Sequence, residues 1–178
     1  MISIKRRQLC LALFLFLASQ YALSACLAEG DLGEAQVKRV VDGDTVHFKD
    51  GRKVRLIGIN TPELDHKDGN HERYALEAKD SLTELTGKTV YYQEGLDKQD
   101  RYGRYLYYLF DKHRISISSQ LLSKGLGYRI AVPPNTRYQD CLQASEKKAR
   151  DKRIGIWKQA LQWQPKAGFE IAQVTLTS

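Results

Sequence analysis

The chain has 178 residues and is poor in cysteine, in proline and in long apolar runs. Three cysteines are too few for the disulfide framework of a small secreted scaffold, and four prolines and thirteen glycines exclude a collagen-like or low-complexity chain. Glycine-rich phosphate loops of the P-loop and dinucleotide types are also missing from the sequence. We therefore expect one compact globular domain.

Histidine is scarce too, and no cluster of cysteine and histidine suggests a zinc site. The four histidines, which fall at no typical ligand spacing, are His47, His66, His71 and His113. Solvent-exposed or packing roles are expected for each of them.

Acidic residues are the rarer charged class, with 21 Asp and Glu against 28 Lys and Arg, a formal net charge of +7. The two signs are interspersed, which excludes a histone-like or disordered basic chain. Removing residues 1–25 takes away Lys5, Arg6 and Arg7 and leaves 25 basic against 21 acidic residues, a net charge of +4. This balance suits a polyanionic partner.

The first 25 residues have the layout of a secretory signal peptide, with three basic residues, an apolar stretch from Leu9 to Ala18, and small residues at Ser24 and Ala25. An N-terminal transmembrane anchor is the alternative, but the stretch falls short of the roughly 20 apolar residues that span a bilayer. We expect export from a bacterial cell, with the protein either periplasmic, at the outer surface or secreted.

Cys26 has competing fates. Leu23-Ser24-Ala25-Cys26 resembles the bacterial lipobox, in which the cysteine carries a lipid after cleavage, and lipidation would tether the domain to a membrane. A simple cut after Ser24 or Ala25 would instead release a soluble protein. An unmodified Cys26 could then pair with Cys141 in an oxidising compartment. The sequence leaves these alternatives open.

Strand and helix patterns alternate along the rest of the chain. The expected order is strands at 37–41, 45–49 and 52–59, a helix ending at Gly87, strands at 89–93 and 105–110, a helix ending near Gly125, an extended piece at 128–132 and a helix at about 137–152. Asp-Gly turns join the first three strands into a meander.

A helix between the third and fourth of five strands is the order of an OB-fold, a small barrel that commonly binds oligonucleotides or oligosaccharides. The predicted fold class is α+β, a five-stranded OB-fold barrel with about three helices. We expect the domain at residues 35–158, after a signal peptide at 1–25 and a short linker at 26–34, and before a C-terminal tail at 159–178. The fold alone assigns no function.

Four short stretches carry chemically active residue types. They are Val41-Asp42-Gly43-Asp44-Thr45, Val54-Arg55-Leu56, Asn60-Thr61-Pro62-Glu63 and Asp100-Arg101-Tyr102-Gly103-Arg104. Taken singly, each is most simply a turn or a strand end. A barrel, however, would bring the ends of the first and third strands close to the start of the fifth. Arg55 also shares a strand face with Ile57 and Ile59, so it needs a partner or a function.

Together these stretches resemble the motifs of the staphylococcal nuclease, or thermonuclease, family over roughly residues 35–158, including Gly155-Ile156-Trp157 after the last helix. The resemblance implies an OB-fold phosphodiesterase that cleaves DNA and RNA with calcium and leaves 3′-phosphates. Carried over by position, it implies Arg55, Glu63 and Arg104 as catalytic residues.

The residue types suit that chemistry. A guanidinium stays charged at any working pH and matches two phosphate oxygens, so Arg55 and Arg104 can clamp a phosphodiester whose transition state gathers negative charge. Glu63 can act as a general base or can orient the attacking water, and the sequence does not separate the two roles.

The resemblance also implies one Ca²⁺ ion held by Asp44, by position 60 and by the backbone carbonyl of Thr61, and calcium takes oxygen ligands of this kind. Asp42 either supports Asp44 or simply makes the turn. The family has Asp where this chain has Asn60, which removes a negative charge but keeps a carbonyl oxygen. Weaker calcium binding is the expected consequence.

A second departure lies at residues 128–135, where the family presents a tyrosine to the nucleotide base and this chain has Arg-Ile-Ala-Val-Pro-Pro at 129–134. That stacking contact is expected to be lost or moved. Arg101 and Tyr102 still offer a positive charge and an aromatic face for substrate binding.

The sequence thus predicts an exported, monomeric, calcium-dependent endonuclease. Its substrates would be single-stranded DNA and RNA, cut with little sequence preference because the expected contacts go to phosphate and sugar. The alternatives are a non-catalytic OB-fold nucleic-acid-binding module, as some relatives have become by losing catalytic residues, and a surface-anchored interaction domain. All three implied catalytic residues are kept, which favours the nuclease.

Overall fold

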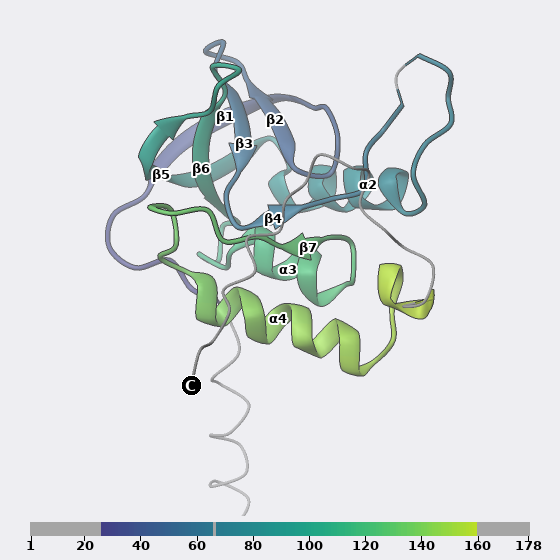
Figure 1. Cartoon of the computed structure of the whole chain (residues 1–178). Helices are drawn as coiled ribbons and strands as arrows, with labels where there is room; N and C mark the ends of the chain where they lie inside the picture. The colour runs from purple at the N-terminus through teal and green to yellow at the C-terminus, as the bar shows by residue number, and fades with distance from the viewer. Residues whose placement is uncertain (1–25, 66, 160–178) are drawn as a thin grey trace, which may run out of the picture.

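The computed structural model describes residues 26–65 and 67–159. Within them, five strands form a closed barrel in the order β1-β2-β3-β6-β5 (Figure 1). Their bounds are β1 (Gly33–Val40), β2 (Thr45–Phe48), β3 (Lys53–Leu56), β5 (Thr89–Gln99) and β6 (Tyr105–Phe110). Neighbours are antiparallel except β3 and β6, which run parallel. The predicted five-stranded OB-fold barrel is confirmed.

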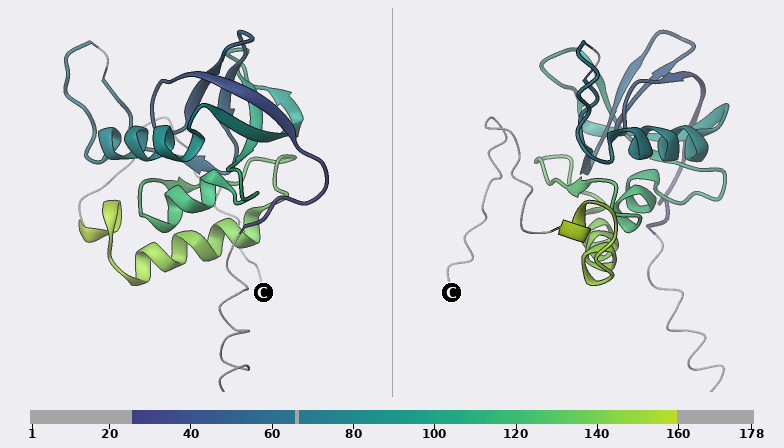
Figure 2. Two further views of the ribbon diagram at one scale, coloured as in Figure 1. Left: turned by 180° about the vertical axis from the view of Figure 1, so that it is seen from behind. Right: turned by 90° about the vertical axis from the view of Figure 1, so that its right-hand side faces the viewer.

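Three helices cover one side of this barrel: α2 (Ala75–Thr86), α3 (Ile117–Ser123) and α4 (Gln139–Asp151). In Figures 1 and 2, α3 lies between the barrel and α4. α2 ends where Gly87 follows it, as the sequence predicts, and a short 3₁₀ helix, η2 (Gly155–Gln159), follows α4. None of the helices in the described ranges is long and apolar enough to span a membrane.

Alternation along β2 and β3 separates a core face from an outer face. Val46, Phe48, Val54 and Leu56 are at most 1% exposed and fill the barrel interior. The intervening residues of both strands therefore point to the outer face of the barrel wall. Burial of the apolar set fixes the strand register, because a slip of one residue would exchange the two faces.

The predicted strand at 52–59 is split into two in the structure. β3 ends at Leu56, the chain bends at Gly58 with a φ of 86°, and β4 (Ile59–Asn60) pairs with β7 (Tyr128–Arg129) in a separate two-stranded sheet. A side chain at Gly58 would also collide with Leu142 of α4. The break matters because it turns the chain toward the β1–β2 turn.

The segment expected to be a linker, 26–34, is part of the folded body. Leu27 forms a β-bridge with Ile115, and β1 already begins at Gly33. Cys26 is 1% exposed and forms a disulfide with Cys141 of α4, with their Cα atoms 5.4 Å apart. The predicted signal peptide at 1–25 and the predicted tail from residue 160 onward lie outside the described residues.

Candidate active site

The turn between β1 and β2 places Asp44 at the edge of the barrel. The Asp42 carboxylate accepts a hydrogen bond from the backbone N–H of Asp44 at 3.0 Å, which closes the turn. A Cβ atom at Gly43 would lie 2.5 Å from Thr61 Oγ1 and 2.6 Å from the Cβ of Ala78, so only glycine allows this close approach. The same hydrogen bond holds the backbone of Asp44 and makes the turn, so the structure is consistent with both roles considered for Asp42.

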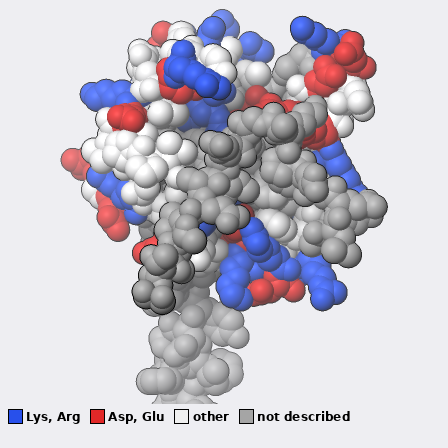
Figure 3. Space-filling view, in the orientation of Figure 1, with Lys and Arg blue, Asp and Glu red and all other residues white. Residues whose placement is uncertain are grey.

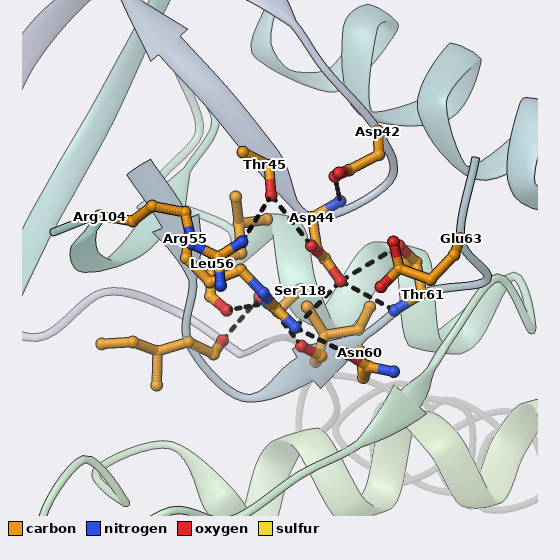
Figure 4. Close-up of polar contacts among 12 residues, drawn as sticks. Asp42, Asp44, Thr45, Arg55, Leu56, Asn60, Thr61, Glu63, Arg104 and Ser118 are labelled. Carbon is orange, nitrogen blue, oxygen red and sulfur yellow. Dashed lines mark hydrogen bonds and ion pairs between the residues drawn. The ribbon is translucent and has the colours of Figure 1, made fainter. Parts of the chain in front are cut away.

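Asp44 and Arg55 form a buried ion pair at the centre of the site (Figure 4). Arg55 Nη2 lies 3.0 Å from Asp44 Oδ2, and the two side chains are only 11% and 5% exposed. Asp44 Oδ2 also accepts hydrogen bonds from the Thr61 backbone N–H at 2.9 Å and from its hydroxyl at 3.2 Å. These bonds offset the cost of removing two charges from water.

Arg55 is more fully bound by the protein than its sequence position indicates. Its Nη1 donates to the carbonyls of Leu56 and Ile59 at 2.6 and 2.8 Å, and its Nη2 donates to Asn60 Oδ1 at 2.9 Å. Four of its five N–H groups thus have protein partners, and within the described residues only the Nε–H has none. Asp44 is the partner that the apolar strand face required.

Arg104 is held mainly along its Nε edge, by Asp100. The Asp100 carboxylate accepts from the backbone N–H of Tyr102 at 2.9 Å, from that of Arg104 at 3.0 Å, and from Arg104 Nε at 2.7 Å. Gly103, with a φ of 74°, closes the turn between them. Burial alone would raise the pKa of Asp100, but the hydrogen bonds from Arg104 and Tyr102 and the charge of Arg104 lower it below its ordinary value.

The remaining donors of Arg104 face the site. Its Nη1 approaches Thr45 Oγ1 at 3.5 Å, and that hydroxyl donates to Asp44 Oδ1 at 3.2 Å. Within the described residues, its Nη2 makes no hydrogen bond. Thr45 therefore connects Arg104 to the ion pair, and the structure brings the four sequence stretches together as predicted.

Tyr102 and Arg101 lie beside Arg104. The guanidinium carbon atoms of Arg101 and Arg104 are 4.9 and 5.6 Å from the centre of the Tyr102 ring. The Tyr102 residue is 69% exposed, so its ring is open to solvent. The turn thus presents an exposed aromatic ring close to two positive charges.

Glu63 completes the cluster from the loop after β4. The residue as a whole is exposed, but Figure 4 shows its carboxylate turned inward toward Asp44 and Thr61. Burial of the carboxylate, followed by the charges of Asp44 and Asp42, raises the pKa of Glu63, and the charge of Arg55 opposes this only in part. Burial and Asp44 raise the pKa of Asp42 as well.

The possible metal ligands beside the Asp44–Arg55 pair are oxygen atoms, which suit a hard divalent cation. Three carboxylates, those of Asp42, Asp44 and Glu63, lie close together, and burial, followed by the charge of Asp44, raises the pKa of Asp42 and of Glu63. The Thr61 carbonyl accepts no hydrogen bond within the described residues. In that part of the chain no three His, Cys, Asp or Glu side chains form a ready cation cage, so a cation would draw on carbonyl and water oxygens too.

Two residues of the site carry more than the sequence indicated. Asp100 lies in one of the four active stretches, but the sequence pattern gives no sign that its carboxylate fixes Arg104. The sequence also gives no sign that Thr45 bridges Arg104 and Asp44. The signal that could have indicated this role for Asp100 is its position four residues before Arg104, across a turn that contains Gly103.

The fold and the site together define the class of protein: an OB-fold barrel that gathers arginines and carboxylates at one rim. The chain belongs to the staphylococcal nuclease family, because the family model described as "Staphylococcal nuclease homologue" matches residues 53–159.

Curated relatives agree with this family. The chain is 33% identical over 126 residues to the thermonuclease of Staphylococcus intermedius, an alignment that covers 68% of this chain and 74% of the relative. It is 32% identical over 138 residues to the thermonuclease of Staphylococcus hyicus, covering 75% and 81%. It is also 32% identical over 129 residues to endonuclease YncB of Bacillus subtilis, covering 68% and 60%.

We predict that Glu63→Gln stabilises the metal-free fold at neutral pH. A folded-state pKa above the unfolded value means that the ionised carboxylate costs stability, so removing its charge raises the midpoint of urea denaturation. The gain should shrink as the pH falls toward the ordinary value of 4.5, where wild-type Glu63 is protonated as well.

Denaturation curves in chelator at several pH values measure this effect, with Glu84→Gln on the exposed face of α2 as the matched control. A pH-independent gain, or an equal gain in the control, would contradict the electrostatic cause.

Proposed function

We propose that this protein is a metal-dependent nuclease that hydrolyses phosphodiester bonds in single-stranded DNA and RNA. The observation that carries the proposal is the convergence of Arg104, with unused donors, and the Glu63 carboxylate on the Asp44–Arg55 pair. Relatives named thermonuclease and endonuclease support the reaction class.

The two arginines would contribute unequally. Arg104 is anchored through Nε and keeps Nη1 and Nη2 for phosphate oxygens, so it suits two-pronged binding of the charge that develops in the transition state. Arg55 keeps a single N–H and adds a fixed positive charge close by. Its rigidity favours catalysis, because no reorganisation is needed when charge develops.

Glu63 would handle the water. A carboxylate with a raised pKa is a better proton acceptor than an ordinary one. In the proposed step the water oxygen forms a bond to phosphorus while a water proton passes to Glu63. The bond to the 5′ oxygen breaks, this oxygen takes a proton from solvent, and a 3′-phosphate remains.

A calcium ion, when bound, would neutralise phosphate charge and lower the pKa of a bound water. Asp44 and the Thr61 carbonyl are the residues proposed to hold it, with Asn60 as a third ligand. The Asn60 amide oxygen accepts from Arg55 in the structure, so it would have to serve Arg55 and the ion together. The Asn60 oxygen is uncharged and is shared with Arg55, which supports weaker calcium binding than an aspartate at this position would give.

Arg101 and Tyr102 would bind the substrate strand. The exposed Tyr102 ring offers a stacking face for an unpaired base, and Arg101 offers a charge for a phosphate. A stacked base must be out of a duplex, which favours single-stranded substrates. Neither residue reads base edges, so little sequence preference is expected.

We also propose that the protein is exported and that its Cys26 is not lipidated. A lipidated cysteine has no thiol left to oxidise, whereas Cys26 is bonded to Cys141. Disulfides persist in oxidising compartments, so the bond supports release into the periplasm or beyond.

We predict calcium-dependent cleavage of a labelled single-stranded oligonucleotide that is abolished by chelator. Arg104→Lys should lower kcat roughly 100- to 1,000-fold because lysine loses the planar fork, and Glu63→Gln should lower it roughly 100- to 10,000-fold. Arg153→Lys, an exposed position at the end of α4, is the matched control. Tight binding without cutting in the wild type would move the conclusion to a non-catalytic binding module.

We predict that Asn60→Asp lowers the half-saturating calcium concentration about tenfold, since the carboxylate keeps an oxygen for Arg55 and adds a negative charge. Calorimetric titration of calcium without substrate measures the effect independently of catalysis. Equal affinities would exclude position 60 as a ligand.

We predict an intact mass without acyl chains for the protein purified from its own cells, and a gain of about 2 Da on reduction, from the two hydrogens added to one disulfide. An acylated N-terminal cysteine would overturn the proposal for Cys26.

A further inference from the structure

Three basic side chains form a row across the outer face of β1, β2 and β3. Arg39 of β1 pairs in register with His47 of β2, and His47 pairs with Lys53 of β3. Residues directly opposite each other in paired strands project from the same face. The exposed Lys38 lies at the adjacent bulge of β1.

This row has no counter-charge among the residues that the structure describes. Within the described residues, none of the side chains of Arg39, His47 and Lys53 makes an ion pair or a hydrogen bond. Along residues 33–56 the carboxylates are Glu34 at the start of β1, Asp42 and Asp44 in the β1–β2 turn, and Asp50, which is bound by Arg52. Partial burial, followed by the charges of Arg39, Lys53 and Lys38, lowers the pKa of His47. Unrelieved repulsion of this kind favours a region that binds anions.

The row adjoins the proposed active site through the strands themselves. His47 stands two residues after Thr45 on β2, and Lys53 stands two residues before Arg55 on β3. Residues two apart share a face and lie roughly 7 Å from each other along a strand. A strand leaving the Arg104 and Arg55 region over this face would therefore meet the row next.

A second group of basic residues lies on α4 and differs from the row because acidic residues are mixed with it. Figure 3 shows Lys and Arg side chains gathered low on the molecule, mixed with acidic ones, over the region where Figure 1 places α4. Two α4 cations have partners: Lys147 pairs with Asp151 at 2.7 Å and Arg150 with Glu146 at 3.1 Å. These pairs are typical of a solvated helix face.

We propose that Arg39, His47 and Lys53 bind backbone phosphates of the nucleic-acid strand next to the scissile bond. The inference rests on the proposed nuclease function and deepens it, because it assigns the substrate as a polynucleotide rather than a dinucleotide. The row crosses two strand spacings, roughly 10 Å, which corresponds to about three phosphates at the roughly 3.4 Å rise of a stacked strand.

The test compares two triple variants with the same loss of formal charge. Arg39→Gln/His47→Gln/Lys53→Gln removes the row. Lys112→Gln/His113→Gln/Lys152→Gln removes exposed residues outside the row, at the turn before α3 and at the end of α4. Binding of a fluorescent 12-nucleotide DNA strand is followed by anisotropy in chelator across a range of salt, and thermal melting checks the fold of each variant.

For the row variant, the slope of log affinity against log salt should fall by about 1.4, since two full charges are lost at roughly 0.7 each on a single strand. The same loss corresponds to roughly 10- to 100-fold weaker binding at low salt. In calcium, KM for the 12-nucleotide strand should rise while kcat for a dinucleotide stays unchanged. The control should keep the wild-type slope.

Equal weakening in both triple variants would show that net charge alone acts and would overturn the proposal, as would an unchanged slope in the row variant. The binding readout separates this outcome from failure of the proposed function. A protein that binds through the row but never cleaves would refute the nuclease and leave the row in place.

Discussion

The buried ion pair between Asp44 and Arg55 is the interaction on which the rest of the site depends. It joins the β1–β2 turn to β3, and the bonds around it reach Thr61 and Asn60 at the end of β4. A buried pair of this kind contributes little net stability, but removing one partner leaves an uncompensated charge and costs roughly 3–5 kcal/mol. Its value is positional, because it holds three separate chain segments in one arrangement.

That arrangement creates the crowding that the proposed chemistry uses. Burial and the nearby charge of Asp44 raise the pKa values of Asp42 and Glu63, and the single charge of Arg55 does not balance three carboxylates. A fold selected only for stability would relieve this repulsion. Its presence at a rim that also carries Arg104 is the pattern expected where a cation and an anionic substrate are bound.

Much of the fold and the membership of the site could be predicted from the sequence. Alternating apolar residues and Asp-Gly turns predicted the meander of the first three strands. The sequence motifs predicted which residues lie together in the site. What could not be predicted depends on contacts distant in sequence. The bend at Gly58 is set partly by Leu142. Two donors of Arg55 are used by the carbonyls of Leu56 and Ile59 on either side of that bend, and residues 26–32 are ordered by Ile115 and Cys141. Local patterns carry no information on such partners.

The extent to which each cation is paired separates structural from functional roles on this barrel. Arg52 is bound by Asp50, by the Tyr107 hydroxyl and by the faces of aromatic rings. Arg55 has four protein-bound donors, Arg104 is fixed at one edge, and Arg39 and Lys53 have no partner within the described residues. A cation that the protein satisfies cannot also offer its full charge to a substrate. The available positive charge therefore increases from Arg55 to Arg104 and onto the outer face of β1 to β3, which is the direction in which a polyanionic strand would be drawn.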